Sequence, residues 1–314
     1  MSLMPASTTE KAAARTRWPA GWAASTPSDV RISPQAISRR MVGRYHEAVS
    51  ARRLVLVTGA SSGIGAACAE VFAANGFDVA ITARREARLQ TVAAGLRERH
   101  GAAVHVFTVD HADPASAARL CEELAARGLT VDALVNNAGY GVPGLYNAVP
   151  WQVHEDFLRV MVAGVCELTY RLMPGMIERG YGRIVNVASL AGLVPAPAGH
   201  ALYGASKAFL IKMSEALAHE GRPHGVHVTA LCPGFTRSEF HDVTGTREQM
   251  KGMPSWMWLD AATVAQQGYD AVMAGEPMRI TGRVNKAVAL AVRYVPQWLV
   301  RIVSGRMAKS YRKT

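Results

Sequence analysis

Between residues 53 and 278 the chain alternates short apolar runs with longer stretches in which apolar residues recur at helical spacing. The apolar runs, which predict buried strands, cover residues 54–57, 78–82, 103–109, 133–136, 183–187 and 226–231. The helical stretches cover residues 63–75, 86–99, 114–127, 151–179, 201–221 and 260–274. Strands that are apolar throughout are typical of a parallel sheet with helices on both faces. The pattern therefore predicts an α/β fold with a single doubly wound parallel sheet.

The two ends of the chain lack this alternation. Residues 1–52 are rich in proline and small residues, and we expect a flexible basic extension with one short helix within 35–52. Residues 284–303 mix apolar and basic side chains at helical spacing, interrupted by Pro296. We therefore expect a folded domain over 53–278, with a substrate-covering segment at 235–259, and a basic amphipathic tail over 279–314.

Charge is concentrated at these ends. The first 53 residues hold nine basic and three acidic side chains, and residues 279–314 hold nine basic and no acidic ones. The total of +11 therefore leaves a net charge of −4 for residues 54–278. This distribution argues against nucleic-acid binding by the folded part. It leaves open peripheral membrane contact through the tail, or a tail helix that packs on the domain or on a second subunit.

Cysteine and histidine spacing predicts no disulfide framework and no metal site. The four cysteines are far apart in apolar or helical contexts, and the ten histidines form no metal-binding motif. Reduced thiols are typical of a cytoplasmic protein. We also find neither an apolar run of transmembrane length nor a secretory signal, and so expect a cytoplasmic protein that can associate with membranes.

The sequence TGASSGIG, from Thr58 to Gly65, joins the first strand to the first helix. Gly59, Gly63 and Gly65 allow a sharp turn and close approach of a phosphate to the backbone, and the helix N-terminus attracts that phosphate. A plain strand-to-helix turn is the alternative. The order strand, glycines, helix favours a dinucleotide site, which would also include Ser61, Ser62 and Ile64.

The residues after the second and third strands bear on the cofactor. Arg84 and Arg85 stand where an acid would bind the ribose of NAD, and guanidinium groups instead suit the 2′-phosphate of NADP. We therefore expect NADP(H) to be preferred over NAD(H), unless both arginines merely begin a solvated helix. Asp110 can accept the adenine amino group, or can simply cap the next helix.

Three further strand ends carry polar or small residues suited to the same site. The predicted cofactor contacts there are Asn137, Ala138 and Gly139 after the fourth strand, and Pro233, Gly234, Thr236 and Ser238 after the sixth. Ser189 follows the fifth strand, where its hydroxyl can donate to a substrate carbonyl. Tyr203 and Lys207 stand four residues apart on the next helix and so share one face.

Together, TGASSGIG, NNAG, Ser189, the run YGASK and Pro233-Gly234 resemble the short-chain dehydrogenase/reductase superfamily. The resemblance implies a Rossmann fold with a seven-stranded parallel sheet. It implies that Tyr203 is the general acid/base and also contacts the cofactor. It further implies that Lys207 lowers the pKa of Tyr203 and binds the nicotinamide ribose, and that Ser189 orients the carbonyl. Homodimers or homotetramers are usual in this superfamily.

One position departs from the superfamily pattern. Met161 stands where such enzymes usually have an asparagine that completes a proton relay to the lysine. Met cannot supply that polar side chain, so the relay would use a backbone carbonyl and water, or proton exchange would be slower.

The segment before the last predicted helix bears on the substrate. Its apolar side chains are Phe235, Phe240, Met250, Met253, Trp256, Met257, Trp258 and Leu259. Such residues form an adaptable apolar wall, although they can also simply pack against one another. We therefore expect an NADP-dependent oxidoreductase of a small hydrophobic carbonyl or alcohol. The alternative is a non-catalytic dinucleotide-binding protein that its basic ends recruit to a membrane or partner.

Overall fold

The computed structural model describes residues 52–196, 198–240 and 254–295. The helix expected within 35–52, Met250 and Met253 of the apolar segment, and the tail beyond residue 295 lie outside these residues, apart from Arg52 itself.

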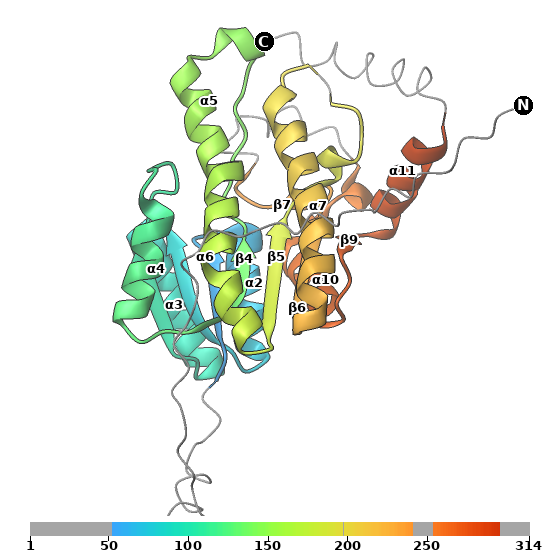
Figure 1. Ribbon diagram of the computed structural model, residues 1–314. Coiled ribbons are helices and arrows are strands. Elements are labelled where there is room, and N and C mark those ends of the chain that lie inside the picture. Colours follow the sequence, from blue (N-terminus) through green and yellow to red (C-terminus); the bar gives the residue numbers. More distant parts are fainter. Residues whose placement is uncertain (1–51, 197, 241–253, 296–314) are drawn as a thin grey trace, which may run out of the picture. The chain divides into compact units, whose positions relative to one another are not determined.

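A seven-stranded parallel sheet forms the centre of the described domain (Figure 1). Its strands are β1 (Leu54–Thr58), β2 (Asp78–Ala83), β3 (Val104–Thr108), β4 (Val131–Asn136), β5 (Gly182–Val187), β6 (Val226–Cys232) and β9 (Met278–Ile280). Their spatial order is β3-β2-β1-β4-β5-β6-β9. The order reverses direction between β1 and β4, so the sheet is doubly wound, as the alternation of apolar runs and helices predicts.

Helices cover both faces of this sheet. Buried side chains of α2 (Gly63–Ala74), α3 (Glu86–His100) and α10 (Ala261–Met273) pack in the core on one face. Those of α4 (Ser116–Ala126) and α6 (Gly164–Glu178) pack on the other, where α7 (Ala201–Gly221) also lies over β6. In Figure 1, α6 and α7 cross the near face of the sheet. This coverage explains why most strands are buried along nearly their whole length.

The helix expected over 151–179 is interrupted. It consists of α5 (Trp151–Leu158), a π-helical turn (Arg159–Ala163) and α6. By length and composition the stretch Trp151–Glu178 could cross a membrane, which differs from our expectation that no apolar run reaches that length. Leu168, Met173 and Met176 of α6 are buried against the sheet, however, as in a core helix of a globular domain.

The seventh strand begins at Met278, the residue where the sequence analysis ends the folded domain. Ala230 of β6 pairs with Met278 and Cys232 with Ile280, so the sheet extends into the expected tail. Helix α11 (Arg283–Tyr294) follows directly, and its Asn285 is buried. A second, two-stranded pairing joins β7 (Thr236–Arg237) to β8 (Leu259–Asp260) and brackets the segment between them.

Candidate active site

The reversal of strand order places the ends of β1 and β4 side by side. In open α/β sheets ligands bind in the crevice at such a switch point. Thr58, the last residue of β1, is buried there, and its hydroxyl accepts hydrogen bonds from the amides of Asn137 and Ala138, both at 3.0 Å. Thr58 was not among the site residues we predicted. Its place as the first residue of TGASSGIG was the available signal.

Asn137 connects the glycine-rich turn to the end of β4. Its side-chain amide donates to the carbonyls of Thr58 at 3.0 Å and Gly59 at 3.1 Å. Gly59 has φ +67°, and a Cβ there would lie 2.7 Å from the Ala138 Cα. A Cβ at Gly65 would lie 2.4 Å from both the Asn137 Nδ2 and the Gly59 carbonyl oxygen. Two of the three glycines are therefore required by contacts within the protein, before any ligand binds.

The N-terminus of α2 is suited to a phosphate. Ser62 stands just before the helix in an extended conformation, its hydroxyl makes no capping hydrogen bond, and the first turn has no acidic residue. Ile64 packs against the core and anchors this turn. The first amides of a helix without such a cap are hydrogen-bond donors for an anion. The residues present therefore fit a dinucleotide pyrophosphate at this turn.

Arg85 lies beside the same turn. Its guanidinium donates to the hydroxyl of Ser61 at 3.0 Å and of Ser62 at 3.3 Å. It also pairs with Glu239 at 3.0 Å, and Arg88 pairs with the same carboxylate. These contacts lower the pKa of Glu239 to about 2. Arg84 is exposed at the start of α3. Our sequence analysis missed Glu239, which is far from the arginines in the sequence.

Asp110 follows β3 and is exposed. Its carboxylate accepts a hydrogen bond from the Ala112 amide at 3.0 Å, which stabilises the turn after β3. The alternative that Asp110 caps the next helix is wrong, because α4 begins at Ser116 after Ala115 and has no side-chain cap. A contact with adenine stays a prediction. The next residue, His111, is buried, and its Nε2 lies 2.8 Å from the Thr82 hydroxyl. Burial lowers the pKa of His111 to about 4, so its ring is neutral at pH 7.

Ser189, Tyr203 and Lys207 converge beyond the ends of β5 and β6. Ser189 begins a short 3₁₀ turn, where its hydroxyl accepts a hydrogen bond from the Ala191 amide and lies 3.4 Å from the Pro233 carbonyl. The Ser189 side chain is close enough to Tyr203 to act on the pKa of its phenol. Lys207 is buried one helical turn after Tyr203, with its ammonium 2.7 Å from the Val187 carbonyl and 5.8 Å from the centre of the Tyr203 ring.

Burial changes the protonation of this group. It raises the pKa of Tyr203, an effect that the nearby Ser189 side chain only partly opposes. This direction is opposite to the one that the superfamily resemblance implies. Burial lowers the pKa of Lys207 to about 8, and its ammonium is held by the Val187 carbonyl rather than by the phenol oxygen. Burial therefore keeps the Tyr203 phenol protonated and able to donate a hydrogen bond.

The turn after β6 connects the site to α11. A Cβ on Gly234 would lie 2.4 Å from both polar side-chain atoms of Asn285, whose amide donates to the Thr281 carbonyl at 2.7 Å. Thr236 is buried and donates to the Gly234 carbonyl at 3.2 Å. Ser238 faces the glycine-rich turn, since a Cβ on Gly63 would lie 3.0 Å from its Cβ. The residues after β6 that we predicted to contact the cofactor thus lie against the glycine-rich turn after β1.

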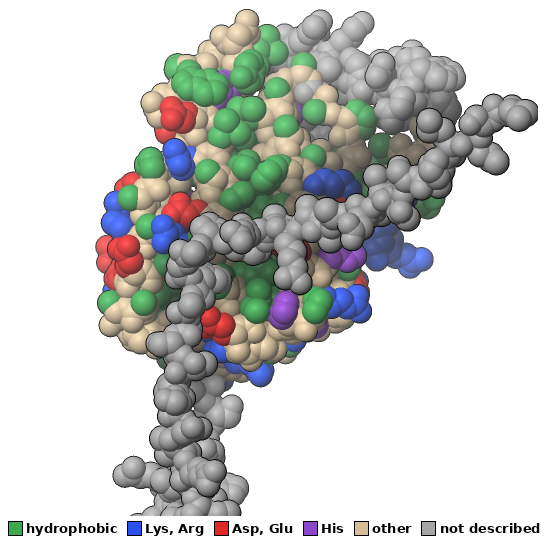
Figure 2. Space-filling model, viewed as in Figure 1, with side chains coloured by type: hydrophobic (Ala, Val, Ile, Leu, Met, Phe, Trp, Pro, Cys, Tyr) green, Lys and Arg blue, Asp and Glu red, His purple; other side chains and the backbone are tan. Residues whose placement is uncertain are grey.

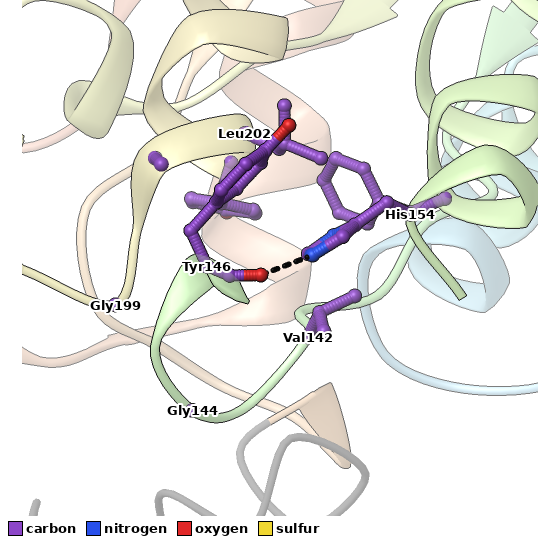
Figure 3. Close-up of a pocket in the computed structure, with 9 residues that line it drawn as sticks. Val142, Gly144, Tyr146, His154, Gly199 and Leu202 are labelled. Atoms are coloured by element: carbon purple, nitrogen blue, oxygen red, sulfur yellow. Dashed lines mark hydrogen bonds between the residues drawn. The ribbon is translucent and has the colours of Figure 1, made fainter. Parts of the chain in front are cut away.

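A small pocket opens beside Tyr203 (Figure 3). It is lined by Val142, Gly144, Tyr146, His154, Phe157, Gly199, Ala201, Leu202 and Tyr203. His154 is buried, donates from its Nε2 to the Tyr146 carbonyl at 2.8 Å, and stacks on the Tyr146 ring. Its Nδ1 has no partner among the described residues. Sequence reasoning missed His154, because a lone histidine on a helix gives no signal.

Only some residues of the apolar segment that we expected to cover the substrate lie near Tyr203. The Phe240 ring lies 5.7 Å from the Tyr203 ring, and so borders the site. Phe235 and Trp258 pack on one another at 5.6 Å, and Leu259 packs against the core. Trp256 is exposed. Within the described part of the segment, Phe240 is therefore placed to contact a substrate at Tyr203, whereas Phe235, Trp258 and Leu259 chiefly pack the protein.

Met161 lies in the π-helical turn and is 1% exposed. A Cβ on Gly139 would lie 2.7 Å from its sulfur, so the thioether occupies the space beside the loop after β4. The position predicted for the relay residue is thus filled by an apolar side chain packed against the loop.

Comparison with known proteins identifies the class. The family model described as short chain dehydrogenase matches residues 53–249. Sulfoacetaldehyde reductase 2 of Chromohalobacter salexigens is 36% identical over 189 residues, covering 60% of this chain and 74% of that protein. A short-chain dehydrogenase from Sphingobium yanoikuyae, solved in complex with NADPH, is 30% identical, with a TM-score of 0.69 over 79% of this chain and 94% of that one. A bulky-bulky ketone specific alcohol dehydrogenase from Comamonas testosteroni is 26% identical, with a TM-score of 0.65 over 79% and 96%.

The chain belongs to the short-chain dehydrogenase family. It is an oxidoreductase that acts on CH–OH groups of small substrates and uses a nicotinamide dinucleotide. The comparisons do not favour the non-catalytic alternative. Among the described residues, no group of three or more histidine, cysteine or acidic side chains is arranged to hold a metal ion. The four cysteines are free thiols.

Proposed function

We propose that this chain is an NADP(H)-dependent oxidoreductase that interconverts a carbonyl and an alcohol on a hydrophobic substrate, running as a reductase. The observation that carries the proposal is the position of the buried Lys207 ammonium, 5.8 Å from the centre of the Tyr203 ring and held by the Val187 carbonyl, with Ser189 close enough to oppose the rise in the pKa of Tyr203. These three side chains stand at the carboxyl edge of the sheet beside the glycine-rich turn.

The bound nicotinamide supplies or accepts the hydride. The Ser189 hydroxyl orients the substrate oxygen, and the protonated Tyr203 donates its proton to that oxygen during reduction. The raised pKa of Tyr203 keeps the proton available at neutral pH. Lys207 holds the nicotinamide ribose and, through the Val187 carbonyl, is itself held in place.

The preference for NADP(H) rests on the charge at the end of β2. Arg85 contacts the hydroxyls of both serines of the glycine-rich turn, and Arg84 precedes it with no acid between the strand and α3. A 2′-phosphate beside this turn would meet guanidinium donors, whereas an acid that binds the ribose of NAD is missing there. The relative from Sphingobium yanoikuyae that was solved with NADPH supports the same choice.

The proposal that the substrate is apolar is based on the side chains that line the pocket. Val142, Phe157 and Leu202 line the space next to Tyr203, and Phe240 borders it. The relative from Comamonas testosteroni, described as specific for bulky ketones, is consistent with this reading.

Titration of the purified protein with NADPH and NADH, followed by nucleotide fluorescence, tests the cofactor. We expect Arg84→Ala to lose about tenfold in NADPH affinity, with NADH affinity unchanged, because a guanidinium–phosphate hydrogen bond is removed. A screen of apolar ketones with NADPH then tests the reaction. Tyr203→Phe should lower kcat by more than about a hundredfold while NADPH still binds. Preference for NADH, or full turnover by Tyr203→Phe, contradicts the proposal.

Assembly and location stay predictions. Trp151 of α5, Tyr170 of α6 and Phe209 of α7 are exposed apolar side chains. Hydrophobic side chains also gather on the face of the molecule drawn in Figure 2, which is suited to a homodimer or homotetramer. Helix α11 exposes Val288 and Leu290, which is compatible with peripheral membrane contact of a cytoplasmic protein. Co-sedimentation with anionic liposomes, with and without residues 283–314, tests the membrane contact. Equal partitioning contradicts it.

A further inference from the structure

The carboxylate of Glu239 lies in the corner between the glycine-rich turn and the start of α3. It pairs with Arg85 at 3.0 Å and with Arg88. Arg85 simultaneously donates to the hydroxyl of Ser61. Two guanidinium groups therefore converge on one anion, which comes from the chain itself.

The same donors are those that the proposed function assigns to the cofactor phosphate. A 2′-phosphate and a carboxylate are both oxyanions that bind guanidinium groups through paired hydrogen bonds. The Nη2 of Arg85 already donates to Ser61, Ser62 and Glu239, so a phosphate that binds this nitrogen has to take the place of the Glu239 carboxylate. The nucleotide phosphate and Glu239 therefore compete for one position.

We propose that Glu239 is a specificity-determining residue, an internal anion that a 2′-phosphorylated nucleotide must displace from Arg85 and Arg88 in order to bind. This inference rests on the proposed use of NADP(H). A nucleotide without the 2′-phosphate leaves the Glu239 pair intact. The carboxylate therefore lowers the affinity for NADP(H), and with it the discrimination between the two cofactors, below what the arginines alone would give.

The displaced residue also stands next to the reacting group. Ser238, on one side of Glu239, lies against Gly63 of the glycine-rich turn, and Phe240, on the other side, lies against the Tyr203 ring. Release of Glu239 thus changes a short stretch whose neighbours contact both the phosphate-binding turn and the acid/base residue. Binding of a 2′-phosphate is expected to alter the surroundings of Tyr203 as well.

The expected magnitude follows from exposure. The side chains of Arg85 and Glu239 are 46% and 35% exposed, so water screens their attraction. Ion pairs of this kind contribute little individually, and two pairs to one carboxylate correspond to about a fivefold change in affinity.

Glu239→Gln removes the charge and keeps the size of the side chain. Glu70→Gln is the matched control, because the Glu70 carboxylate is 36% exposed and pairs with Arg99 and His100 at the other end of α3. The probes are adenosine 2′,5′-bisphosphate and 5′-AMP by calorimetry, and NADPH and NADH by fluorescence. We expect Glu239→Gln to bind the bisphosphate and NADPH about fivefold more tightly, with 5′-AMP and NADH unchanged. Glu70→Gln should match the wild type.

Three results would overturn the inference about Glu239. The first is unchanged affinity for the bisphosphate in Glu239→Gln. The second is weaker affinity, which would show that Glu239 holds Arg85 in place for the phosphate. The third is an equal gain in Glu70→Gln, which would reflect net charge alone. Thermal unfolding of both variants shows that they are folded, and Glu239→Ala repeats the test without the amide.

The outcomes separate this inference from the proposed function. A wild type that prefers NADPH, with no gain in Glu239→Gln, refutes the role of Glu239 and leaves the cofactor choice standing. A wild type that prefers NADH, with a gain for the bisphosphate in Glu239→Gln, refutes the proposed cofactor preference and supports the competition at Arg85.

Discussion

Gly65→Ala tests whether the glycine-rich turn and the loop after β4 are held by direct contact. Gly65 is a buried residue of α2 whose Cβ would lie 2.4 Å from the Gly59 carbonyl oxygen and 2.4 Å from the Asn137 amide nitrogen. Ordinary contacts of this kind are more than an ångström longer. The carbonyl belongs to the backbone and the amide is held by two hydrogen bonds, so neither can move without loss.

The magnitude combines three effects. Overpacking costs about 1–3 kcal/mol, and each of the two Asn137 hydrogen bonds contributes about 1 kcal/mol. Alanine in place of glycine within a helix returns about 1 kcal/mol. We therefore expect Gly65→Ala to lower the free energy of unfolding by about 2–4 kcal/mol, which corresponds to a fall in Tm of about 4–16 °C.

Gly95→Ala is the matched control for this change. Gly95 also lies within a helix, α3, but the atoms nearest to its Cβ position belong to the flexible guanidinium of Arg99. This variant should be as stable as the wild type or more stable by up to about 1 kcal/mol. Urea unfolding gives the stabilities, and NADPH fluorescence shows whether the turn still binds nucleotide. If Gly65→Ala matches Gly95→Ala in both measurements, the turn is not held as the structure shows.

Two further changes test groups at either side of the site. Burial lowers the pKa of His111 from 6.5 to about 4, so as the pH falls the unfolded chain binds a proton at this histidine before the folded chain does. The wild type should therefore lose stability between pH 6.5 and about 4 more steeply than His111→Asn does. Parallel curves of the free energy of unfolding against pH, measured in urea, would refute this. Gly234→Ala should lower Tm because its Cβ would lie 2.4 Å from the side chain of Asn285. Asn285→Ala in the same chain should restore most of that loss. If the effects of the two substitutions on Tm are strictly additive, α11 does not contact the turn after β6.

Local sequence patterns determined much of this protein. Six strands of the sheet were predicted from apolar runs, because strands buried on both faces must be apolar along their whole length. Tyr203 and Lys207 were expected on one helix face from their spacing alone, since helical geometry is local. The glycine-rich turn was recognised because strand, glycines and helix follow one another directly in the chain.

Other features depended on contacts between distant segments. The strand Met278–Ile280 has only three residues, and it forms because the edge of β6 offers hydrogen bonds to it. Glu239 meets Arg85 across 154 positions of sequence, and no local pattern marks that pair. The direction of the pKa shift of Tyr203 is likewise set by burial and by Ser189.

The physical reason for this division is the distance along the chain over which each interaction acts. Hydrophobic periodicity, helix spacing and turn chemistry act over a few neighbouring residues, so the sequence alone determined the order of elements and the residues at their ends. Desolvation and ion pairing depend on which segments the folded chain brings together. Only the tertiary structure could therefore show that an anion of the protein itself lies in the corner beside Arg85, and that burial raises the pKa of Tyr203.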